Sequence, residues 1–368
     1  MKLAVVSGEA SGDLHASEVV RELRRLDPSL EVFGIGGDLL RGEGMRLLHH
    51  VREMAIIGLF NVARHLPRFL RIFRELVAEI AKERPDVVLL VDFAEFNMRV
   101  ARACSDMGIH VVYYISPQLW AWRQGRVRTI AKYVDRMMVI FPFEVDFYKH
   151  HDVAVTYVGH PLVEQLGDVQ RPQQSGDALR IALMPGSRRS EVLHLFPPML
   201  AAIDILRRER AIDAYVIQAP TIHREKLERL MREAGVEVAI RPHDRGEGLA
   251  AADVALTSSG TAALEAAVLG TPCVVVYHLS RLNYLMARLL VKVRFMSLIN
   301  IVAGREVVPE LIQKDVNGPR IAEEVRKLIV PERYEQVREQ LGAVRAQLGE
   351  PGASRRVAEE INRLVGAS

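Results

Sequence analysis

The chain has 368 residues, 49% of them hydrophobic and 26% charged, a composition that is typical of a folded protein and excludes a disordered one. Its 49 basic and 46 acidic residues give a net charge of +3, which is too small to indicate a nucleic-acid partner. The two cysteines, Cys104 and Cys273, stand far apart in sequence, so neither a disulfide framework nor a metal-binding spacing follows. No apolar run reaches the roughly 18–20 residues of a membrane-spanning helix. No secretion leader precedes the first strand, so we expect a cytoplasmic protein.

Short apolar strands alternate with helical patterns along the first half of the chain. Each of these strands is a run rich in Val, Ile and Leu, as parallel strands covered by helices on both faces usually are. A helix predicted over 69–83 ends before Pro85, which cannot continue it. The strands that we predict here are 2–6, 32–35, 87–91, 111–115 and 137–140.

A polar stretch with glycine and proline, 167–177, interrupts this pattern and is predicted to be a linker. The pattern predicts an α/β protein of two Rossmann-like domains, 1–168 and 178–345, which face a cleft and bind ligands at the carboxyl ends of their strands. The last segment, 350–368, is helical and packs either on the first domain or on a partner chain. The strands predicted in the second half are 179–184, 214–218, 236–240, 254–257 and 273–277.

A strand that runs into a glycine-rich loop occurs once in each half. The first loop is 7–13, Ser-Gly-Glu-Ala-Ser-Gly-Asp, and the second is 185–191, Pro-Gly-Ser-Arg-Arg-Ser-Glu. Such a loop, followed by a helix, is how an open α/β sheet begins a ligand site. The glycines of the first loop do not have the dinucleotide spacing, which argues against a nicotinamide cofactor.

Asp92 follows the apolar strand 87–91, at the sheet edge where such proteins bind ligands. Its aromatic neighbours, Phe93 and Phe96, could raise the pKa of the carboxyl and suit it to act as a general base. The alternative is a helix N-cap, a role that Asp fills well. The sequence alone leaves these two interpretations about even.

The second loop is predicted to bind an anion. Arg188 and Arg189 lie near a helix N-terminus, where the helix dipole disfavours cations, so a bound anion would reverse the balance. Gly186 lets the backbone approach a ligand, Ser187 can donate a hydrogen bond, and an arginine fork can grip a phosphate. The alternative, which we favour less, is a surface arginine pair on an ordinary turn.

A third loop, 257–265, follows a predicted strand and leads into an alanine-rich helix. Ser259, Gly260 and Thr261 lie where free N–H groups and the helix dipole suit a phosphate. Glu265 lies one turn past Thr261 on the same face, where its carboxylate could accept bonds from ribose hydroxyls. Plain N-capping is the commoner role of such a run, but the second loop in the same domain strengthens the binding interpretation.

Trp120 and Trp122 follow the predicted strand 111–115, where they could form the apolar wall of a cleft or pack in the core. Two segments, 54–73 and 282–295, mix large apolar residues with basic ones, which suits an anionic membrane leaflet or an acyl chain. The alternative for each segment is an amphipathic helix packed on its domain. No Asp-x-Asp, His-Glu-x-x-His or Cys-x-x-Cys pattern occurs, so we predict no metal site.

Short motifs spread over nearly the whole chain carry a resemblance to one family. These motifs are 8–13, 92–97, 114–117, 120–123, 158–160, 185–188, 259–265 and 300–306. Together they resemble the lipid A disaccharide synthases, inverting glycosyltransferases with the two-domain fold called GT-B. Family members often have Asp-x-Pro-Asp-Phe-Asn where 92–97 reads Asp-Phe-Ala-Glu-Phe-Asn, so Glu95 replaces the second aspartate and the proline is missing.

The resemblance implies a UDP-2,3-diacylglucosamine donor and a 2,3-diacylglucosamine 1-phosphate acceptor, joined into a β-1,6-linked disaccharide 1-phosphate with release of UDP. It implies that Asp92 takes the proton of the acceptor hydroxyl, that Arg188 and Asn300 contact the UDP part, and that no cofactor is needed. It adds to the nucleotide pocket Gly186, Ser187, Ser259, Gly260, Thr261 and Glu265. We place on the acceptor side Glu9, Ser11, Gly12, Asn97 and Trp120.

Two other functions fit the two-domain plan. A UDP-N-acetylglucosamine 2-epimerase, or another GT-B enzyme with a soluble substrate, would share it but should lack the two apolar, basic segments. A two-domain solute-binding protein would also share it, but it normally has a secretion leader and needs no base at Asp92. For the favoured function we expect contact with the inner leaflet of the membrane and no nucleic-acid partner, and we leave a homodimer open.

Overall fold

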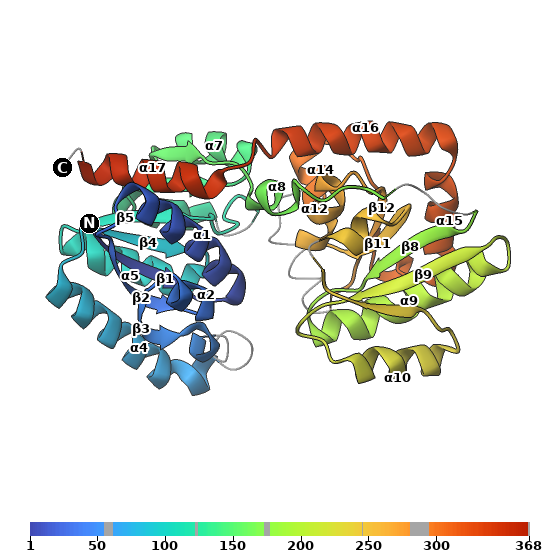
Figure 1. Cartoon of the computed structure of the whole chain (residues 1–368), viewed down its shortest axis with the longest axis horizontal. Coiled ribbons are helices and arrows are strands. Elements are labelled where there is room, and N and C mark those ends of the chain that lie inside the picture. The colour runs from blue at the N-terminus through green and yellow to red at the C-terminus, as the bar shows by residue number, and fades with distance from the viewer. Residues whose placement is uncertain (55–61, 122–123, 173–176, 245, 280–293, 367–368) are drawn as a thin grey trace. The chain divides into compact units, whose positions relative to one another are not determined.

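A computed structural model of the chain describes residues 1–54, 62–121, 124–172, 177–244, 246–279 and 294–366, with the backbone alone at 62–65. The chain divides into two compact units, Met1–Pro161 with Glu350–Ser368, and Leu162–Gly349. Each unit is built on one parallel β-sheet covered by helices (Figure 1), so the predicted α/β class with two Rossmann-like domains is confirmed. The division falls after Pro161, ahead of the segment predicted as the linker. The predicted cleft between the domains stays a prediction.

The sheet of the first unit has seven strands in the order β3-β2-β1-β4-β5-β6-β7. The strands are β1 (Lys2–Ser7), β2 (Glu31–Gly36), β3 (Arg46–His50), β4 (Val87–Val91), β5 (His110–Tyr114), β6 (Arg136–Val139) and β7 (Val155–Tyr157). The strand order changes direction between β1 and β4, which is the usual place of a ligand site in such sheets. The register pairs Ser7 with Val91 and Val91 with Tyr114, so the residues that follow these three strands leave the sheet at one edge.

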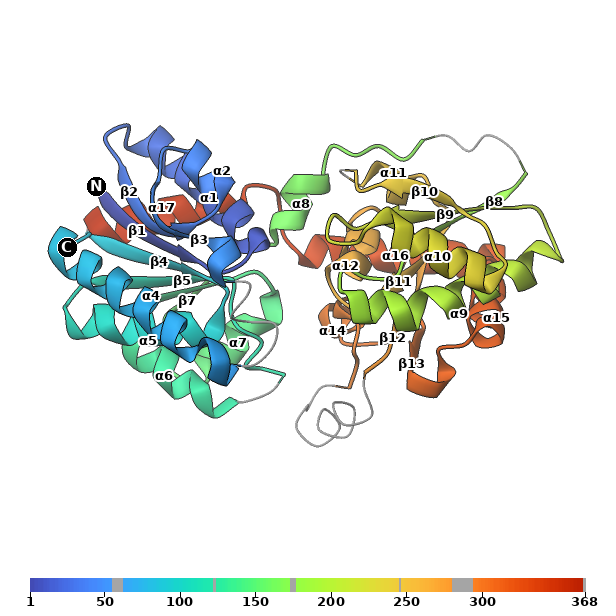
Figure 2. The same ribbon diagram turned by 90° about the horizontal axis from the view of Figure 1, so that it is seen from below.

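Helices cover both faces of this sheet (Figure 2). They are α1 (Ala10–Leu26), α2 (Asp38–Gly42), α4 (Val62–Glu83), α5 (Ala94–Asp106), α6 (Val127–Tyr133), α7 (Pro142–Lys149) and α17 (Ala353–Gly366), with a 3-10 turn at Gln124–Arg126. A buried apolar core joins α4, α5, α6 and α7 to alternate strand residues such as Val6, Leu90 and Tyr113.

The last helix of the chain, α17, packs beside α1 on its own first unit. Arg356 Nε donates to the carbonyl oxygen of Val158 at 2.8 Å, and Glu360 pairs with Arg136 at 3.2 Å. These contacts tie the end of the chain to strands β6 and β7 of the first unit. Within the described ranges, no helix combines the length and the apolar character that crossing a membrane requires.

The sheet of the second unit has the order β10-β9-β8-β11-β12-β13. Its strands are β8 (Leu179–Met184), β9 (Ile212–Gln218), β10 (Ala239–Pro242), β11 (Val254–Ser258), β12 (Cys273–Tyr277) and β13 (Glu310–Ile312). Its helices are α8 (Pro161–Leu166), α9 (Arg189–Arg207), α10 (Arg224–Ala234), α11 (Glu247–Ala250), α12 (Thr261–Val268), α14 (Leu298–Ala303), α15 (Gly318–Leu328) and α16 (Pro331–Gln347), with a 3-10 turn at Gln313–Asp315. The direction of the order changes between β8 and β11, so the loops that follow these two strands share an edge.

Candidate active site

Asp92 stands where β4 ends, in a backbone conformation that side-chain-bearing residues rarely adopt. The φ angle is 49° at Asp92 and 48° at Phe93, so two consecutive non-glycine residues are left-handed. Ile115, which follows the neighbouring strand β5, also has a positive φ of 63°. Backbone strain of this kind costs roughly 1–3 kcal/mol per residue and clusters at functional sites. The strained residues lie at one edge of the sheet, which indicates a functional site at that edge.

The backbone at Asp92 is held by its neighbours. The Tyr113 hydroxyl donates to the Asp92 carbonyl oxygen at 2.6 Å, and Asn97 Nδ2 donates to the same oxygen at 2.7 Å. The Phe93 ring occupies the space next to Gly8, where a Cβ atom would lie 2.1 Å from the ring. The N-cap of α5 is Phe93, with no side-chain capping bond, so the capping alternative for Asp92 is not what the structure shows.

The environment of the Asp92 carboxyl favours its protonated form. Burial raises the pKa of Asp92 above its ordinary value, and the negative charge of Glu9 raises it further. A hydrogen bond from the Phe93 N–H and the charge of His15 lower this pKa, but they do not cancel the rise. A carboxylate whose pKa is raised is a stronger base, which is what a proton-accepting aspartate needs.

The residues predicted on the acceptor side differ in what they can reach. Glu9 and Ser11 are exposed at the start of α1, whereas Gly12 is buried there. Asn97 is fully buried, and its amide donates to the Asp92 carbonyl, so it cannot touch a ligand in this arrangement. Asn97 therefore supports the backbone of Asp92 in this arrangement, and its place on the acceptor side stays a prediction.

Trp120 is half-buried and is held by a buried carboxylate. Its indole Nε1 donates to Glu144 Oε1 at 3.1 Å, and its ring meets Phe143 edge-on at 4.9 Å. The N–H of Phe141 donates to the other oxygen of Glu144 at 3.2 Å. Burial raises the pKa of Glu144 to about 7 in spite of these bonds. Trp120 thus packs partly into its domain, as the alternative interpretation of the sequence has it.

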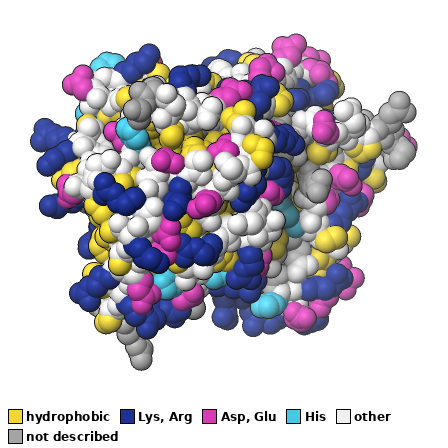
Figure 3. All heavy atoms as spheres, turned by 60° about the vertical axis from the view of Figure 1, so that its left-hand side comes forward, with side chains coloured by type: hydrophobic (Ala, Val, Ile, Leu, Met, Phe, Trp, Pro, Cys, Tyr) yellow, Lys and Arg dark blue, Asp and Glu magenta, His cyan; other side chains and the backbone are white. Residues whose placement is uncertain are grey.

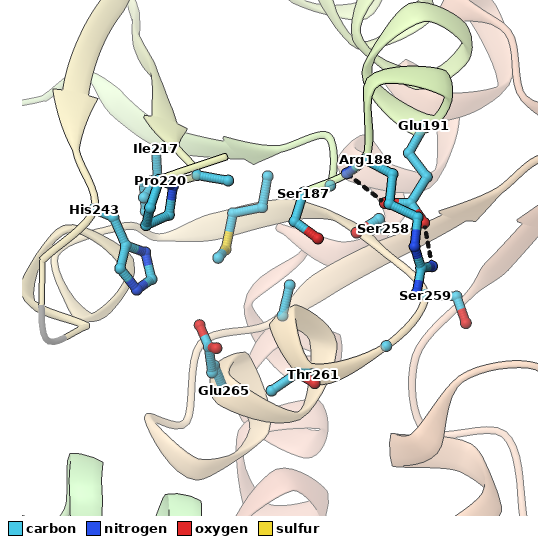
Figure 4. A pocket seen from close by; sticks show the side chains of 15 residues that line it. Ser187, Arg188, Glu191, Ile217, Pro220, His243, Ser258, Ser259, Thr261 and Glu265 are labelled. Carbon is cyan, nitrogen blue, oxygen red and sulfur yellow. Dashed lines mark hydrogen bonds and ion pairs between the residues drawn. The ribbon is translucent and has the colours of Figure 1, made fainter. Parts of the chain in front are cut away.

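In the second unit, the loops after β8 and β11 line one cavity of about 310 Å³ (Figure 4). Its wall contains every residue predicted for the nucleotide pocket except Asn300. These residues are Gly186, Ser187, Arg188, Ser259, Gly260, Thr261 and Glu265. Helices α9 and α12 begin at this cavity, so their N-terminal N–H groups and dipoles favour an anion there.

Arg188 already has a partner in its own chain. Its Nη1 donates to Glu191 Oε1 at 2.9 Å, and its backbone N–H donates to Oε2 at 3.3 Å (Figure 4). Part of the negative charge that we expected from a bound anion is therefore supplied by Glu191. Because the Arg188 side chain is 74% exposed and such surface pairs contribute about 0–1 kcal/mol, a phosphate can compete for the guanidinium. Gly186 has a φ of 107°, and a Cβ there would lie 2.4 Å from Glu191 Oε2, so this position requires glycine.

Glu265 lines the same cavity from α12. Burial, and after it the negative charge of Asp244, raises the pKa of Glu265 to about 7. The described part of the chain offers no hydrogen-bond donor to its carboxylate. A group of this kind gains most from a ligand that brings its own donors, as the hydroxyls of a sugar do.

Several wall residues escaped the sequence analysis, among them Ile217, Pro220 and His243. Ile217 and Pro220 lie at the end of β9, and His243 directly follows β10. Because β9 and β10 lie beside β8, their carboxyl ends meet the same edge of the sheet. Position directly after a strand was the signal that could have found them.

Asn300 lies away from the cavity and is fully buried in α14. Its Oδ1 accepts from the N–H groups of Val307 and Val308 at 2.8 and 3.1 Å. Its Nδ2 donates to the Val308 carbonyl at 2.9 Å and to Glu310 Oε1 at 2.7 Å. The amide thereby uses its full hydrogen-bonding capacity on its own chain. The contact of Asn300 with UDP stays a prediction.

Other sequence predictions fall outside these two places. Glu95, which departs from the family pattern, forms an ion pair with Arg126. Trp122 and most of the segment 282–295 lie outside the described residues. In the part of the chain that is described, no three or more His, Cys, Asp or Glu side chains are grouped as metal ligands would be.

Comparisons with known proteins agree with the resemblance seen in the sequence. The model of the Lipid-A-disaccharide synthetase family matches residues 3–361. The chain belongs to this family. The Lipid-A-disaccharide synthase of Myxococcus xanthus is 43% identical over 373 residues, which cover 99% of this chain and 97% of the relative. The resemblance predicted from the motifs is thus confirmed.

Two solved structures show the same fold at low sequence identity. A putative UDP-N-acetylglucosamine 2-epimerase from Listeria monocytogenes is similar with a TM-score of 0.68 at 14% identity, over 100% of this chain and 97% of that one. MurG of Acinetobacter baumannii is similar with a TM-score of 0.62 at 14% identity, over 98% and 99% of the two chains. This family member therefore has the two-domain GT-B fold that was predicted.

Proposed function

We propose that this protein joins two acylated glucosamines. It transfers the sugar of UDP-2,3-diacylglucosamine to a hydroxyl of 2,3-diacylglucosamine 1-phosphate, which gives a β-1,6-linked disaccharide 1-phosphate and UDP. The observation that carries the proposal is family membership over residues 3–361. An anion-favouring cavity in the second unit and a basic carboxylate in the first are what this reaction needs.

The proposal assigns the UDP part of the donor to the cavity of the second unit. Ser187 and Thr261 offer hydroxyls there, Arg188 offers a full positive charge, and α9 and α12 offer the positive ends of their dipoles. As the bond between the anomeric carbon and the phosphate oxygen breaks, the leaving UDP gains negative charge. Groups already fixed in place stabilise that charge without reorganising, which lowers the barrier, and we expect them to act in place of a metal ion.

The proposal assigns activation of the acceptor to Asp92 in the first unit. Its carboxylate takes the proton of the acceptor hydroxyl while the hydroxyl oxygen attacks the anomeric carbon of the donor. Attack from the side opposite to UDP inverts the configuration at that carbon. The proton then rests on Asp92, whose raised pKa suits this step, until it passes to solvent.

The test is release of UDP from the acylated donor and acceptor by the wild type, Asp92→Asn and Asp106→Asn. We expect Asp92→Asn to lower kcat by about 10²–10⁴-fold, the usual contribution of a general base. Asp106, an exposed aspartate at the end of α5, is the matched control and should leave kcat unchanged. Full activity of Asp92→Asn would exclude it as the base, and failure of the wild type on acylated sugars would exclude the substrates. Loss of turnover with a chelator would contradict the metal-free reaction.

We also propose contact with an anionic lipid surface through the first turns of α4. Leu66 there is 42% exposed, and Arg71 nearby is 64% exposed in its side chain. Ile72 and Leu76 are fully buried, so the rest of this helix packs on its domain. Figure 3 shows basic, acidic and hydrophobic side chains intermixed on one face of the molecule. Sedimentation with vesicles that contain or lack phosphatidylglycerol tests this lipid contact. Equal recovery of the protein with both kinds of vesicle would refute an electrostatic contribution.

The homodimer stays a prediction.

A further inference from the structure

Tyr113 carries a hydroxyl that the proposed reaction does not use. The side chain lies fully buried on the face of the sheet that packs against α4 and α5. Burial, and after it the negative charge of Asp92, raises the pKa of Tyr113 well above its ordinary value, so the group stays a hydrogen-bond donor. The donated bond, of 2.6 Å, goes to the backbone carbonyl of Asp92. The buried hydroxyl of Tyr113 thus bonds the backbone of the residue that we propose as the base.

The explanation lies in the left-handed turn at the end of β4. With φ at 49°, Asp92 departs from the strand conformation, and its carbonyl leaves the ladder that β4 shares with its neighbours. A carbonyl that is withdrawn from water without gaining a donor destabilises the folded protein. Here it has two side-chain donors, Tyr113 from β5 and Asn97 from α5. The N–H of Asp92 still donates to the carbonyl of Tyr114, and the two side chains satisfy the carbonyl that has left the ladder.

We propose that Tyr113, together with Asn97, is a positioning residue that sets the direction of the Asp92 carboxylate. The inference rests on the proposed role of Asp92 as the base. The direction of a Cα–Cβ bond follows from the backbone angles, so whatever fixes the left-handed turn also fixes where the carboxylate points. A displacement of about 1 Å at a reacting group can lower a rate about 10²-fold. Tyr113 itself is enclosed and touches no ligand, so it acts only through Asp92.

Tyr113→Phe removes one oxygen atom and keeps the ring that fills the core. We expect kcat to fall about tenfold to hundredfold, with the KM of both substrates unchanged, because the loss is one of alignment rather than binding. We also expect the acidic limb of the pH profile of kcat/KM to move to lower pH. A relaxed turn lets water reach the carboxyl of Asp92, which brings its pKa back toward the ordinary value.

Tyr215→Phe is the matched control. Tyr215 is also fully buried, and its hydroxyl also donates to a backbone carbonyl, that of Gly248, at 2.6 Å. It lies in the second unit, whereas Asp92 lies in the first. Both substitutions should lower the melting temperature by similar amounts, whereas only Tyr113→Phe should lower kcat.

A double-mutant cycle with Asp92→Asn separates this inference from the proposed function. If Tyr113 acts through Asp92, its substitution should change the residual rate of Asp92→Asn by less than about twofold. An unchanged kcat and pH profile in Tyr113→Phe, while Asp92→Asn is impaired, would overturn the positioning role alone. So would an equal loss of rate in both backgrounds. Full activity of Asp92→Asn would instead remove the base assignment on which the inference rests.

Discussion

The two strand–loop–helix starts, β1 to α1 and β8 to α9, use their polar side chains in opposite ways. In the first, Asp13 is only 4% exposed, and its carboxylate accepts the N–H groups of Gly37 and Leu39 at 2.6 and 3.1 Å. It thereby supplies the start of α2 with the bonds that a helix N-terminus lacks. In the second, Arg188 is 74% exposed and lines a cavity. The charged side chain of the first start bonds the protein's own backbone, whereas that of the second is exposed at a cavity.

The glycines show the same contrast. Gly8 leaves room for a ring of the same chain, that of Phe93, next to the proposed base. Gly186 leaves room for Glu191 and keeps a loop at the edge of the cavity. A glycine-rich loop after a strand is therefore no proof of a ligand site. What distinguishes the two is whether the charged side chain of the loop is buried on the protein's own backbone, as Asp13 is, or exposed at a cavity, as Arg188 is.

Among the changes that test this comparison, the largest effect should come from Gly8→Ala, which alters the first start. The new Cβ would lie 2.1 Å from the Phe93 ring, so the ring must move, and with it the left-handed turn that carries Asp92. We expect kcat to fall about 10²-fold through misplacement of the carboxylate. Overpacking should also cost about 1–3 kcal/mol of stability. UDP binding, which we propose for the other unit, should be unchanged, and calorimetry measures it.

Gly42→Ala in the same unit is the control for Gly8→Ala. A Cβ at Gly42 would meet nothing within 4 Å, so neither kcat nor stability should suffer. If Gly8→Ala kept the wild-type kcat, the ring of Phe93 would be free to move without moving Asp92. The first start would then have no part in alignment.

The second largest effect should come from Arg188→Ala, which breaks the second start. Loss of a hydrogen bond to a charged group costs about 1.5–3 kcal/mol, so Kd for UDP should rise about tenfold to hundredfold. Arg208→Ala is the control, because Arg208 is also 74% exposed and also pairs with an acid of its own helix, Asp204. Equal Kd values for the two variants would mean that Arg188 serves only its pair with Glu191.

The sequence predicted the centre of each sheet better than its edges. Strands β4 and β8 have the predicted bounds, because buried central strands are continuous apolar runs. The strand predicted at 236–240 was misplaced and is Ala239–Pro242, and three strands were missed, β3, β7 and β13. All four lie at sheet edges, where strands are short and half-exposed and lack an apolar run.

The same limit applies to the site. Position after a strand was enough to place Asp92 and Arg188 at the carboxyl edges of their sheets. Position after a strand could not show that the amide of Asn300 makes all its hydrogen bonds within its own chain. Nor could it find Tyr113, which reads as one more apolar residue of β5. The register of β4 with β5 determines which carbonyl accepts the Tyr113 hydroxyl. Local sequence does not determine the pairing of segments that lie far apart in the chain.

The smallest effect should come from Glu265→Gln, which sharpens the comparison inside the second unit. Burial raises the pKa of Glu265 from 4.5 to about 7, so the folded protein binds this proton more tightly than the unfolded one. The contribution of Glu265 to stability therefore falls as the pH rises from about 4.5 to about 7, and it stays low above that. Gln carries no such charge. Without ligand, Glu265→Gln should be more stable than the wild type near pH 8, by at most about 3 kcal/mol, and show little gain near pH 5. UDP should bind only about threefold to tenfold more weakly, since the amide oxygen still accepts one bond.

Glu144→Gln is the control for Glu265→Gln, because Glu144 has hydrogen-bond donors in its own chain. Its pKa is also raised to about 7 by burial, but its carboxylate accepts bonds from Trp120 and Phe141. An amide has only one oxygen, so in Glu144→Gln the side-chain NH₂ group would face the N–H of either Trp120 or Phe141. Glu144→Gln should therefore lower the melting temperature near pH 8, where Glu265→Gln should raise it. Burial raises the pKa of each acid to about 7, but only Glu144 has hydrogen-bond donors in the described part of its own chain. If Glu265→Gln also lowered the melting temperature at that pH, Glu265 would have donors within its own chain, and its carboxylate would not be kept for a ligand.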